Sequence, residues 1–361
     1  MSAPRPVQII GGGLAGLTLG IGLRQQGIPA TIHEAGNYPR HRVCGEFISG
    51  RGQETLARLG LQKLLEAAGA VPARTAAFFT ATRSAAPHPL PASALCLSRF
   101  TLDQLLADEF QKLGGELRVN TRQPFIGVQA SACTDRLKPE PQQEGVIRAT
   151  GRRVQAGQGN ERWFGLKIHA RNVPLAADLE MHVSPQGYVG LCKINGGEVN
   201  ICGIFRRRTD ANFSSPPARD WLRGPPGSPL RERLAAAEFD ESSFCAVAGI
   251  SLRPQRAADR HEICLGDAIT MIPPVTGNGM SMAFESAELA VEPLAAWSRG
   301  EISWSAARQK IARACDERCS RRLRWAKWLQ HCLLAPALQN PLIALASRSD
   351  WFWRMAFENT R

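Results

Sequence analysis

The sequence predicts an α/β fold: a Rossmann-like domain with a parallel sheet in a three-layer arrangement, a smaller antiparallel-sheet domain, and a C-terminal helical tail. An apolar, β-branched run at 7–10 is followed directly by a glycine-rich turn and a helix-compatible run, 14–26. From 163 to about 205, alternating residues have the period of two that is typical of antiparallel strands. With 361 residues, the chain is long enough for two domains and an extension.

The glycine-rich turn has the G-x-G-x-x-G spacing at Gly11, Gly13 and Gly16. In such a turn the first glycine permits a tight bend, the second lets the backbone approach a pyrophosphate, and the third lets the helix pack closely on the strand. A second strand, 29–33, ends at Glu34, where an acidic side chain accepts hydroxyls of an adenosine ribose. The combination predicts a dinucleotide site, and the alternative is a plain β-turn-α unit.

A second turn of this kind lies near the other end of the chain. A strand ends at Gly266–Asp267, a rigid Pro-Pro loop follows, and a Gly-x-Gly turn begins a helix that runs to about Trp297. Asp267 could accept a polyol hydroxyl, and the free amides at the helix start suit the electron-rich edge of a flavin. The alternative is a plain strand-loop-helix crossover. The residues assigned to this turn are Gly266, Asp267, Pro274, Gly277, Asn278, Gly279 and Met280.

Composition and periodicity divide the rest of the chain. A helix or helix pair is expected at 52–68, and a helix capped by Thr101 follows Leu97. The Gly196-Gly197 pair between two alternating runs indicates a hairpin. A surface loop is expected at 131–145 and a Pro-rich linker at 214–229. The predicted domains are a discontinuous dinucleotide-binding domain at 1–70, 94–160 and 254–300, a substrate domain at 71–93 and 161–253, and a helical segment at 301–361.

Charge and cysteine content narrow the class of protein. The formal net charge is +12, but the chain has no zinc-finger spacing and no basic helix interleaved with aromatics, so nucleic acid is not a predicted partner. Ten scattered cysteines without a C-x-x-C pair are typical of reduced thiols in a cytoplasmic protein. Cys315 and Cys319 have no second pair, and no metal site is predicted.

The tail at 301–361 has an unusual composition. It contains eleven Lys or Arg against five Asp or Glu, and five of the eight tryptophans. The favoured interpretation is a cap over the substrate pocket, with buried tryptophans and solvated arginines. Basic, tryptophan-bearing amphipathic helices also suit an anionic bilayer surface, so peripheral contact with the inner face of a membrane is the first alternative. A surface for a partner or a second copy is the other alternative.

Taken together, the motifs resemble the FAD-dependent oxidoreductases of the para-hydroxybenzoate hydroxylase fold, and within them the geranylgeranyl reductase-like branch. The resemblance covers roughly 5 to 300 and includes Arg42-x-x-Gly45, supported by Arg99 on a later helix. It implies bound FAD, with Glu34 on the ribose and Arg42 and Arg99 near the phosphates and flavin. It also implies that Asp267 binds the ribityl chain and that the 277–280 turn lies against the isoalloxazine.

The reaction is predicted to be hydroxylation of a hydrophobic small molecule, such as a polyketide, phenolic or isoprenoid-type lipid. A reductase that saturates C=C bonds of an isoprenoid is the alternative, and a non-catalytic flavin- and lipid-binding protein is a third. Hydroxylation is favoured because the lipid-reductase signature Tyr-x-Trp-x-Phe-Pro is reduced to a run beginning at Tyr188 that lacks the Trp and the Pro. No separate nicotinamide motif is present, so NAD(P)H is expected to act as a transient reductant.

Five residues are candidates for chemistry or substrate contact. Cys44 matches the cysteine-glycine loop of the reductase branch and could donate a proton there, or it could be a small buried thiol. Glu46 is the next candidate, with a surface carboxylate as the alternative. His169, His182 and Tyr188 lie in the predicted substrate sheet and face either the pocket or solvent.

Overall fold

A five-stranded parallel sheet forms the centre of the first part of the fold. The computed structural model describes residues 3–81, 84–122, 144–152, 161–208 and 218–361. The strand order β13-β7-β1-β2-β6, with parallel pairing throughout, confirms the predicted Rossmann-like arrangement. Val7, Ile9, Ile32 and Ile147 are fully buried, as expected for a sheet covered on both faces. The strands are β1 (Val7–Ile10), β2 (Ala30–His33), β6 (Glu116–Arg118), β7 (Val146–Arg148) and β13 (Ile263–Cys264).

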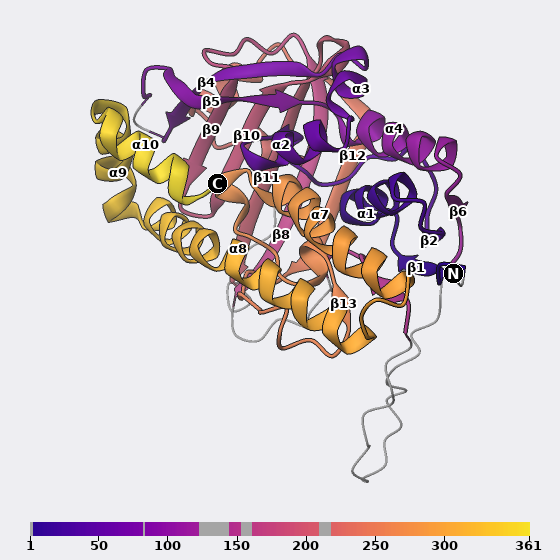
Figure 1. Ribbon diagram of the computed structural model, residues 1–361. Coiled ribbons are helices and arrows are strands. Elements are labelled where there is room, and N and C mark those ends of the chain that lie inside the picture. Colours follow the sequence, from indigo (N-terminus) through magenta and orange to yellow (C-terminus); the bar gives the residue numbers. More distant parts are fainter. Residues whose placement is uncertain (1–2, 82–83, 123–143, 153–160, 209–217) are drawn as a thin grey trace, which may run out of the picture.

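Helices α4 (Arg99–Lys112) and α7 (Gly279–Ser298) both pack against α1 (Leu14–Gln25) beside this sheet (Figure 1). Every residue of α1 from 14 to 23 is buried because neighbours cover it on several sides. The shorter α2 (Arg51–Arg58) and α3 (Gln62–Ala67) form the helix pair predicted at 52–68. Helix α1 begins shortly after β1 ends, and α7 follows β13 in the chain. The N-terminal ends of α1 and α7 therefore lie close to the carboxyl edge of the sheet.

The cap of α4 differs from the prediction. Ser98, not Thr101, is the N-cap residue: its backbone is extended, and its hydroxyl accepts a hydrogen bond from the Thr101 amide at 3.1 Å. Thr101 already lies in the first turn, where its hydroxyl contacts Ser98 Oγ and Asn195 Nδ2, each at 3.0 Å. The sequence offers two hydroxyl residues three positions apart, and tertiary contacts decide between them.

An eight-stranded sheet forms the second part, in the order β12-β8-β11-β10-β9-β4-β5-β3. Most pairs are antiparallel, and the hairpin predicted at Gly196-Gly197 joins β10 to β11. The β4–β9 pair is parallel, so the sheet is mixed; these strands are far apart in the sequence and no hairpin constrains their direction. The strands are β3 (Phe47–Ile48), β4 (Val71–Phe79), β5 (His88–Cys96), β8 (Glu161–Arg171), β9 (Leu179–Ser184), β10 (Gly187–Lys193), β11 (Val199–Arg208) and β12 (Glu238–Ile250).

The last part of the chain is helical, as predicted. Helix α8 (Trp304–Leu334) packs along α7, and α9 (Pro336–Arg348) and α10 (Asp350–Asn359) follow it (Figure 1). The chain then returns to the interior, so that the Arg361 side chain contacts Gly50 just before α2. Two short helices, α5 (Ala218–Arg223) and α6 (Pro229–Arg233), precede β12.

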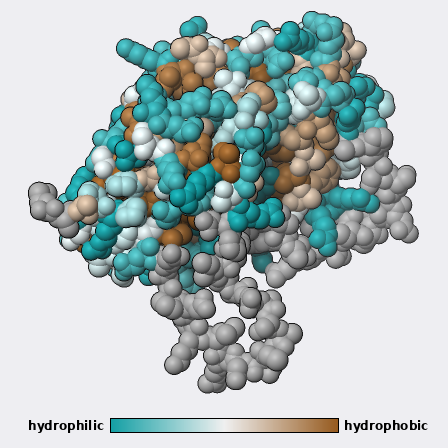
Figure 2. Space-filling view, turned by 90° about the vertical axis from the view of Figure 1, so that its right-hand side faces the viewer, coloured by the Kyte–Doolittle hydropathy of each residue, from teal (hydrophilic) through white to brown (hydrophobic). Residues whose placement is uncertain are grey.

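None of the described helices is long and apolar enough to cross a bilayer. On the side of the molecule that carries β6 and α4, Figure 2 shows a mainly hydrophilic surface interrupted by patches of apolar residues. The surface loop predicted at 131–145 lies almost entirely outside the described residues, as does the start of the linker predicted at 214–229. The predicted domain boundaries stay a prediction.

Candidate active site

A cavity of about 2270 Å³ lies where the two sheets and the C-terminal helices meet. Single-ligand pockets usually measure about 300–1,000 Å³, so this cavity has room for a dinucleotide and a second molecule. Both predicted turns line it, and so do β9, β10 and β11 of the eight-stranded sheet. Residues of α8, α9 and α10 close another side. The two turns predicted from opposite ends of the sequence therefore share one cavity.

The three glycines of the first turn have three different surroundings. A Cβ on Gly11, which has φ +108°, would lie 2.4 Å from the Ala149 carbonyl oxygen, so the tight turn requires glycine. A Cβ on Gly16 would lie 1.9 Å from the Gly11 carbonyl oxygen, so the helix touches the turn. A Cβ on Gly13 would meet nothing within 4 Å, because this residue faces the open cavity. This arrangement leaves room at Gly13 for the phosphate that the sequence predicts there.

Glu34 is buried at the end of β2 and lines the same cavity. Its carboxylate accepts hydrogen bonds from the amides of Gly12 and Gly36, each at 2.8 Å, and pairs with Arg40 at 2.6 Å. A carboxylate has about four acceptor sites, so one remains for a ribose hydroxyl. Burial alone would raise the pKa of Glu34, but Arg40 and the Gly36 amide lower it and hold the group ionised.

Arg42 and Arg99 converge on Asp103, a fully buried acid that sequence reasoning missed. Arg99 Nε and Nη2 donate to the two carboxylate oxygens of Asp103 at 2.6 and 2.8 Å, and Arg42 Nε lies 3.3 Å away. The i,i+4 spacing of Arg99 and Asp103 on one helix could have predicted this ion pair from the sequence. Tyr38, also missed, donates a hydrogen bond from its hydroxyl to the Gly12 carbonyl. Both predicted arginines line the cavity.

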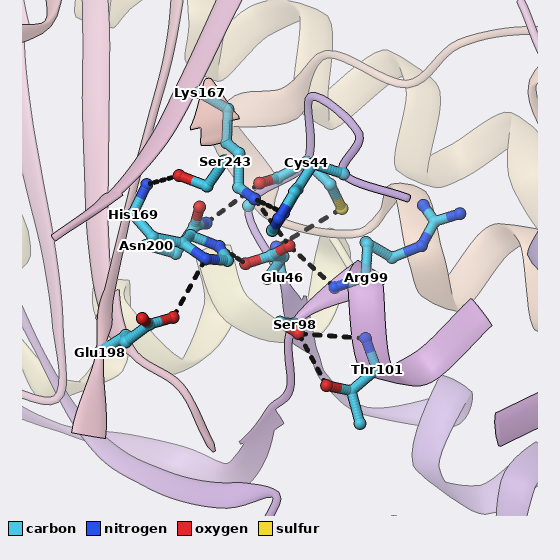
Figure 3. Close-up of polar contacts among 12 residues, drawn as sticks. Cys44, Glu46, Ser98, Arg99, Thr101, Lys167, His169, Glu198, Asn200 and Ser243 are labelled. Carbon is cyan, nitrogen blue, oxygen red and sulfur yellow. Dashed lines mark hydrogen bonds and ion pairs between the residues drawn. The ribbon is translucent and has the colours of Figure 1, made fainter. Parts of the chain in front are cut away.

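The loop that follows Arg42 brings two predicted residues together (Figure 3). Cys44 lines the cavity and accepts a hydrogen bond from the Glu46 amide at 3.4 Å, and Gly45 faces open space. Burial raises the pKa of the Cys44 thiol, so the neutral form, which can give up a proton, is favoured. Glu46 is fully buried, which differs from the alternative of a surface carboxylate.

The second turn contributes a carboxylate and free amides. Gly266 adopts φ +58° and its amide donates to Ser286 Oγ at 2.9 Å, which directs Asp267 to the cavity. The described residues provide no hydrogen bond to the Asp267 carboxylate, and burial raises its pKa. Gly279 begins α7, and a Cβ there would meet nothing within 4 Å. The cavity lining includes Gly266, Asp267, Pro274, Gly277, Gly279 and Met280, whereas Asn278 lies behind it.

Asn278 is buried beside the turn, and its Oδ1 lies 3.3 Å from Ser49 Oγ. Gly277 is left-handed at φ +65°, and a Cβ on it would lie 2.9 Å from the Phe47 ring. The second turn therefore packs directly against the end of the Cys44 loop.

The three residues predicted to contact substrate separate into two groups. Tyr188 on β10 lines the cavity, and its buried hydroxyl makes no hydrogen bond of normal geometry with the described residues. His182 instead stacks on Phe79, with ring centroids 4.6 Å apart, and its Nε2 lies 2.9 Å from Glu180. His169 lies behind Glu46 and is not part of the cavity lining. Of the three, only Tyr188 lines the cavity.

The residues fit FAD. Gly13 offers a cradle that a side chain would fill, and Glu34 keeps an acceptor for the ribose. The Asp267 carboxylate has no hydrogen-bond partner among the described residues and could bind the ribityl chain. The free amides at the start of α7 would suit a ring edge on which negative charge develops on reduction. All four features line one cavity.

Comparison with protein families agrees with this geometry. The family described as FAD binding domain matches residues 5–149. This chain contains a FAD binding domain. It is a FAD-dependent oxidoreductase with FAD as its cofactor. No match to the chain was found among curated protein sequences.

Solved structures with the same fold cover nearly the whole chain of this oxidoreductase. The flavin-dependent brominase Bmp2 is 17% identical, with a TM-score of 0.66 over 99% of this chain and 98% of its own. PqsL, a probable FAD-dependent monooxygenase from Pseudomonas aeruginosa, is 16% identical, with a TM-score of 0.67 over 96% and 99%. The flavin-dependent halogenase CmlS is 21% identical, with a TM-score of 0.67 over 90% of this chain and 63% of its own. These likenesses show the fold; the geranylgeranyl reductase-like branch stays a prediction.

Proposed function

We propose that this oxidoreductase is a monooxygenase that hydroxylates a hydrophobic small molecule, such as a polyketide, phenolic or isoprenoid-type lipid. The observation that carries the proposal is an apolar chamber beside the second turn, between the eight-stranded sheet and the C-terminal helices. It is part of the large cavity and lies next to the Cys44 loop. Its walls include Met181, Tyr188, Ile250, Leu333, Ile343 and Phe352.

The chain's own residues would perform three tasks there. When bound, FAD supplies two-electron chemistry, in which NAD(P)H is the reductant, one oxygen atom of O₂ enters the substrate and the other leaves as water. The apolar walls exclude water from this step and bind the body of the substrate. Tyr188, which lines the same wall, can position the substrate through its ring. The amides of Gly279 and Met280 stabilise negative charge at the ring edge.

The structural neighbours support oxygen chemistry on small molecules. They include a flavin-dependent brominase, a flavin-dependent halogenase and a probable FAD-dependent monooxygenase. PqsL also has a structure in complex with 2-aminobenzoylacetate. The reductase alternative rests on the Cys44-Gly45 loop, since a thiol kept neutral by burial can supply the proton for C=C reduction.

We expect the reduced holoprotein to transfer one labelled oxygen atom from ¹⁸O₂ to a hydrophobic phenol such as 1-naphthol. The check is mass spectrometry of the product, with oxygen uptake and hydrogen peroxide followed in parallel. Anaerobic reoxidation of the reduced protein by a geranylgeranyl compound, without label transfer in air, would contradict the proposal and favour the reductase. In that case Cys44→Ser tests the proton donor, because unchanged turnover would remove Cys44 from this role.

We also propose that the C-terminal helices touch an anionic membrane surface from the cytoplasmic side. Trp351 is 72% exposed, and Trp328, Leu338 and Leu345 are 44%, 46% and 47% exposed on α8 and α9. Exposed Arg324, Lys327, Arg348 and Arg354 lie on the same helices. These helices form one wall of the chamber. A hydrophobic substrate could therefore enter the chamber directly from the bilayer.

The membrane proposal predicts that the protein floats with vesicles containing phosphatidylserine at low salt and less at high salt. Trp328→Ala/Trp351→Ala should reduce the floated fraction at least fivefold without changing FAD content. Phe100→Ala, which removes an exposed aromatic on α4, is the matched control. Absence of flotation at every salt concentration would contradict the proposal.

A further inference from the structure

Glu46 is the residue at which the FAD-binding region and the eight-stranded sheet are joined by buried charges (Figure 3). Its Oε1 accepts the Arg99 amide at 2.8 Å, at the start of α4. Its Oε2 lies 2.7 Å from His169 Nε2, and Oε1 lies 3.4 Å from Lys167 Nζ, both on β8. Glu46, Lys167 and His169 are 0%, 0% and 2% exposed. One carboxylate therefore connects the start of α4 with β8, although His169 lies 123 positions after Glu46 in the sequence.

The backbone of Glu46 is in an unusual conformation. Its φ is +54°, in the left-handed region that residues other than glycine rarely adopt. Such a conformation persists only where surrounding contacts enforce it, and it is found preferentially at functional sites. Here the enforcing contacts are those of the side chain, together with the Glu46 carbonyl, which accepts the Leu97 amide at 3.2 Å.

The bend at Glu46 sets the position of the cavity loop. The sheet holds this loop at two further points: Asn200 Nδ2 donates to the Cys44 carbonyl at 3.0 Å, and Cys192 Sγ donates to the Gly45 carbonyl at 3.3 Å. Beyond the bend, the Phe47 ring touches the second turn at Gly277. The loop is thus fixed between the sheet on one side and the turn predicted to hold the flavin ring on the other.

Replacing Glu46 by a neutral residue is expected to destabilise the protein because of the charged groups around its carboxylate. Lys167 is fully buried, and Glu46 is its one carboxylate partner within the described part of the chain. His41 Nδ1 also faces Lys167 Nζ at 3.0 Å, and His169 Nδ1 lies 3.3 Å from the partly exposed Glu198. Removing the Glu46 charge would leave the buried Lys167 ammonium without a carboxylate partner among the described residues.

We propose that Glu46 is a positioning residue whose carboxylate, held by Lys167 and His169 of β8, fixes the 42–47 loop against the FAD and the substrate sheet. The proposal rests on the FAD cofactor and not on the oxygen chemistry. A hydroxylase and a reductase would both depend on it. Failure of the monooxygenase proposal therefore leaves this one open to its own test.

The test compares Glu46→Gln with Glu285→Gln, a matched loss of charge from a second buried carboxylate. Glu285 is 2% exposed, and its Oε1 and Oε2 accept hydrogen bonds from Arg322 Nη1 and Nη2 at 2.6 and 2.8 Å. Glu285 does not line the cavity. We expect Glu46→Gln to raise the FAD dissociation constant at least tenfold, measured by flavin fluorescence quenching, and to shift the visible band of bound FAD. We expect Glu285→Gln to lower the unfolding midpoint while both flavin readouts stay at wild-type values.

Two further variants separate a loss of FAD binding from a failure to fold and from loss of the outer carboxylate. If Glu46→Gln does not fold, Glu46→Gln/Lys167→Met removes both charges and should fold while showing the same weak FAD binding. Glu198→Gln removes the outer carboxylate beside His169 and should leave the FAD dissociation constant unchanged. Wild-type FAD affinity and spectrum in the Glu46 variants would overturn the proposal. So would equal losses of rate in Glu46→Gln and Glu198→Gln with normal FAD affinity, which would assign the cluster to proton transfer instead.

Discussion

Gly16→Ala is expected to prevent stable folding of the FAD-binding domain, whereas Gly13→Ala is expected to leave the fold intact and abolish tight FAD binding. A Cβ on Gly16 would lie 1.9 Å from a backbone oxygen of Gly11, and neither group can move without separating α1 from β1. Overpacking of this kind costs about 3 kcal/mol or more, since main chain is on both sides. A Cβ on Gly13 meets no protein atom within 4 Å and would clash only with a bound pyrophosphate.

The measurements are urea unfolding of the apoprotein and titration with FAD. Gly13→Ala should unfold at a urea concentration close to wild type and bind FAD at least tenfold more weakly. Gly16→Ala should unfold at a much lower concentration, or fail to accumulate as folded protein. Normal FAD affinity in Gly13→Ala would place the pyrophosphate elsewhere. Equal destabilisation by both substitutions would refute the division of roles between the two glycines.

These glycines also show what local sequence chemistry can predict. The strand, turn, helix and second strand around Gly11, Gly13 and Gly16 are specified by contacts between residues close in the sequence, and the structure has all four elements in place. The second turn was predicted for the same reason: a left-handed Gly277 and a helix start at Gly279 need particular residue types at fixed spacing. Both turns line one cavity, as expected for a single cofactor.

Features set by distant contacts were not predictable in this way. Strand β12 was missed because an Asp-Glu-Ser-Ser run breaks its alternation, and its pairing with β8 shifts register between Asp240 and Cys245. Nothing near Glu46 in the sequence indicates that it is buried, because its partners Lys167 and His169 follow more than a hundred residues later. His169 alternates on a strand like a pocket residue, but its ring nitrogens face two carboxylates.

Glu34→Ala is expected to weaken FAD binding at least tenfold and to destabilise the apoprotein by about 1–3 kcal/mol, the range for charged hydrogen bonds. The substitution removes the acceptor of two backbone amides and the partner of Arg40, and it removes the acceptor left for the ribose. The check is FAD titration together with urea unfolding at neutral pH. Glu288→Ala is the control, because Glu288 is held by Thr55 at 2.7 Å and by Arg58 outside the cavity.

Acid provides an independent test of the same carboxylate. The pKa of Glu34 is lowered in the folded protein from an ordinary value of 4.5, so the unfolded chain binds more protons than the folded one in this range. The stabilisation from Glu34 is therefore complete above about pH 5 and is lost as the pH falls through its folded pKa. Glu34→Gln should lose less stability than wild type between about pH 5 and pH 3. Parallel acid profiles for the two proteins would show that the carboxylate is not held ionised by Arg40 and the backbone amides.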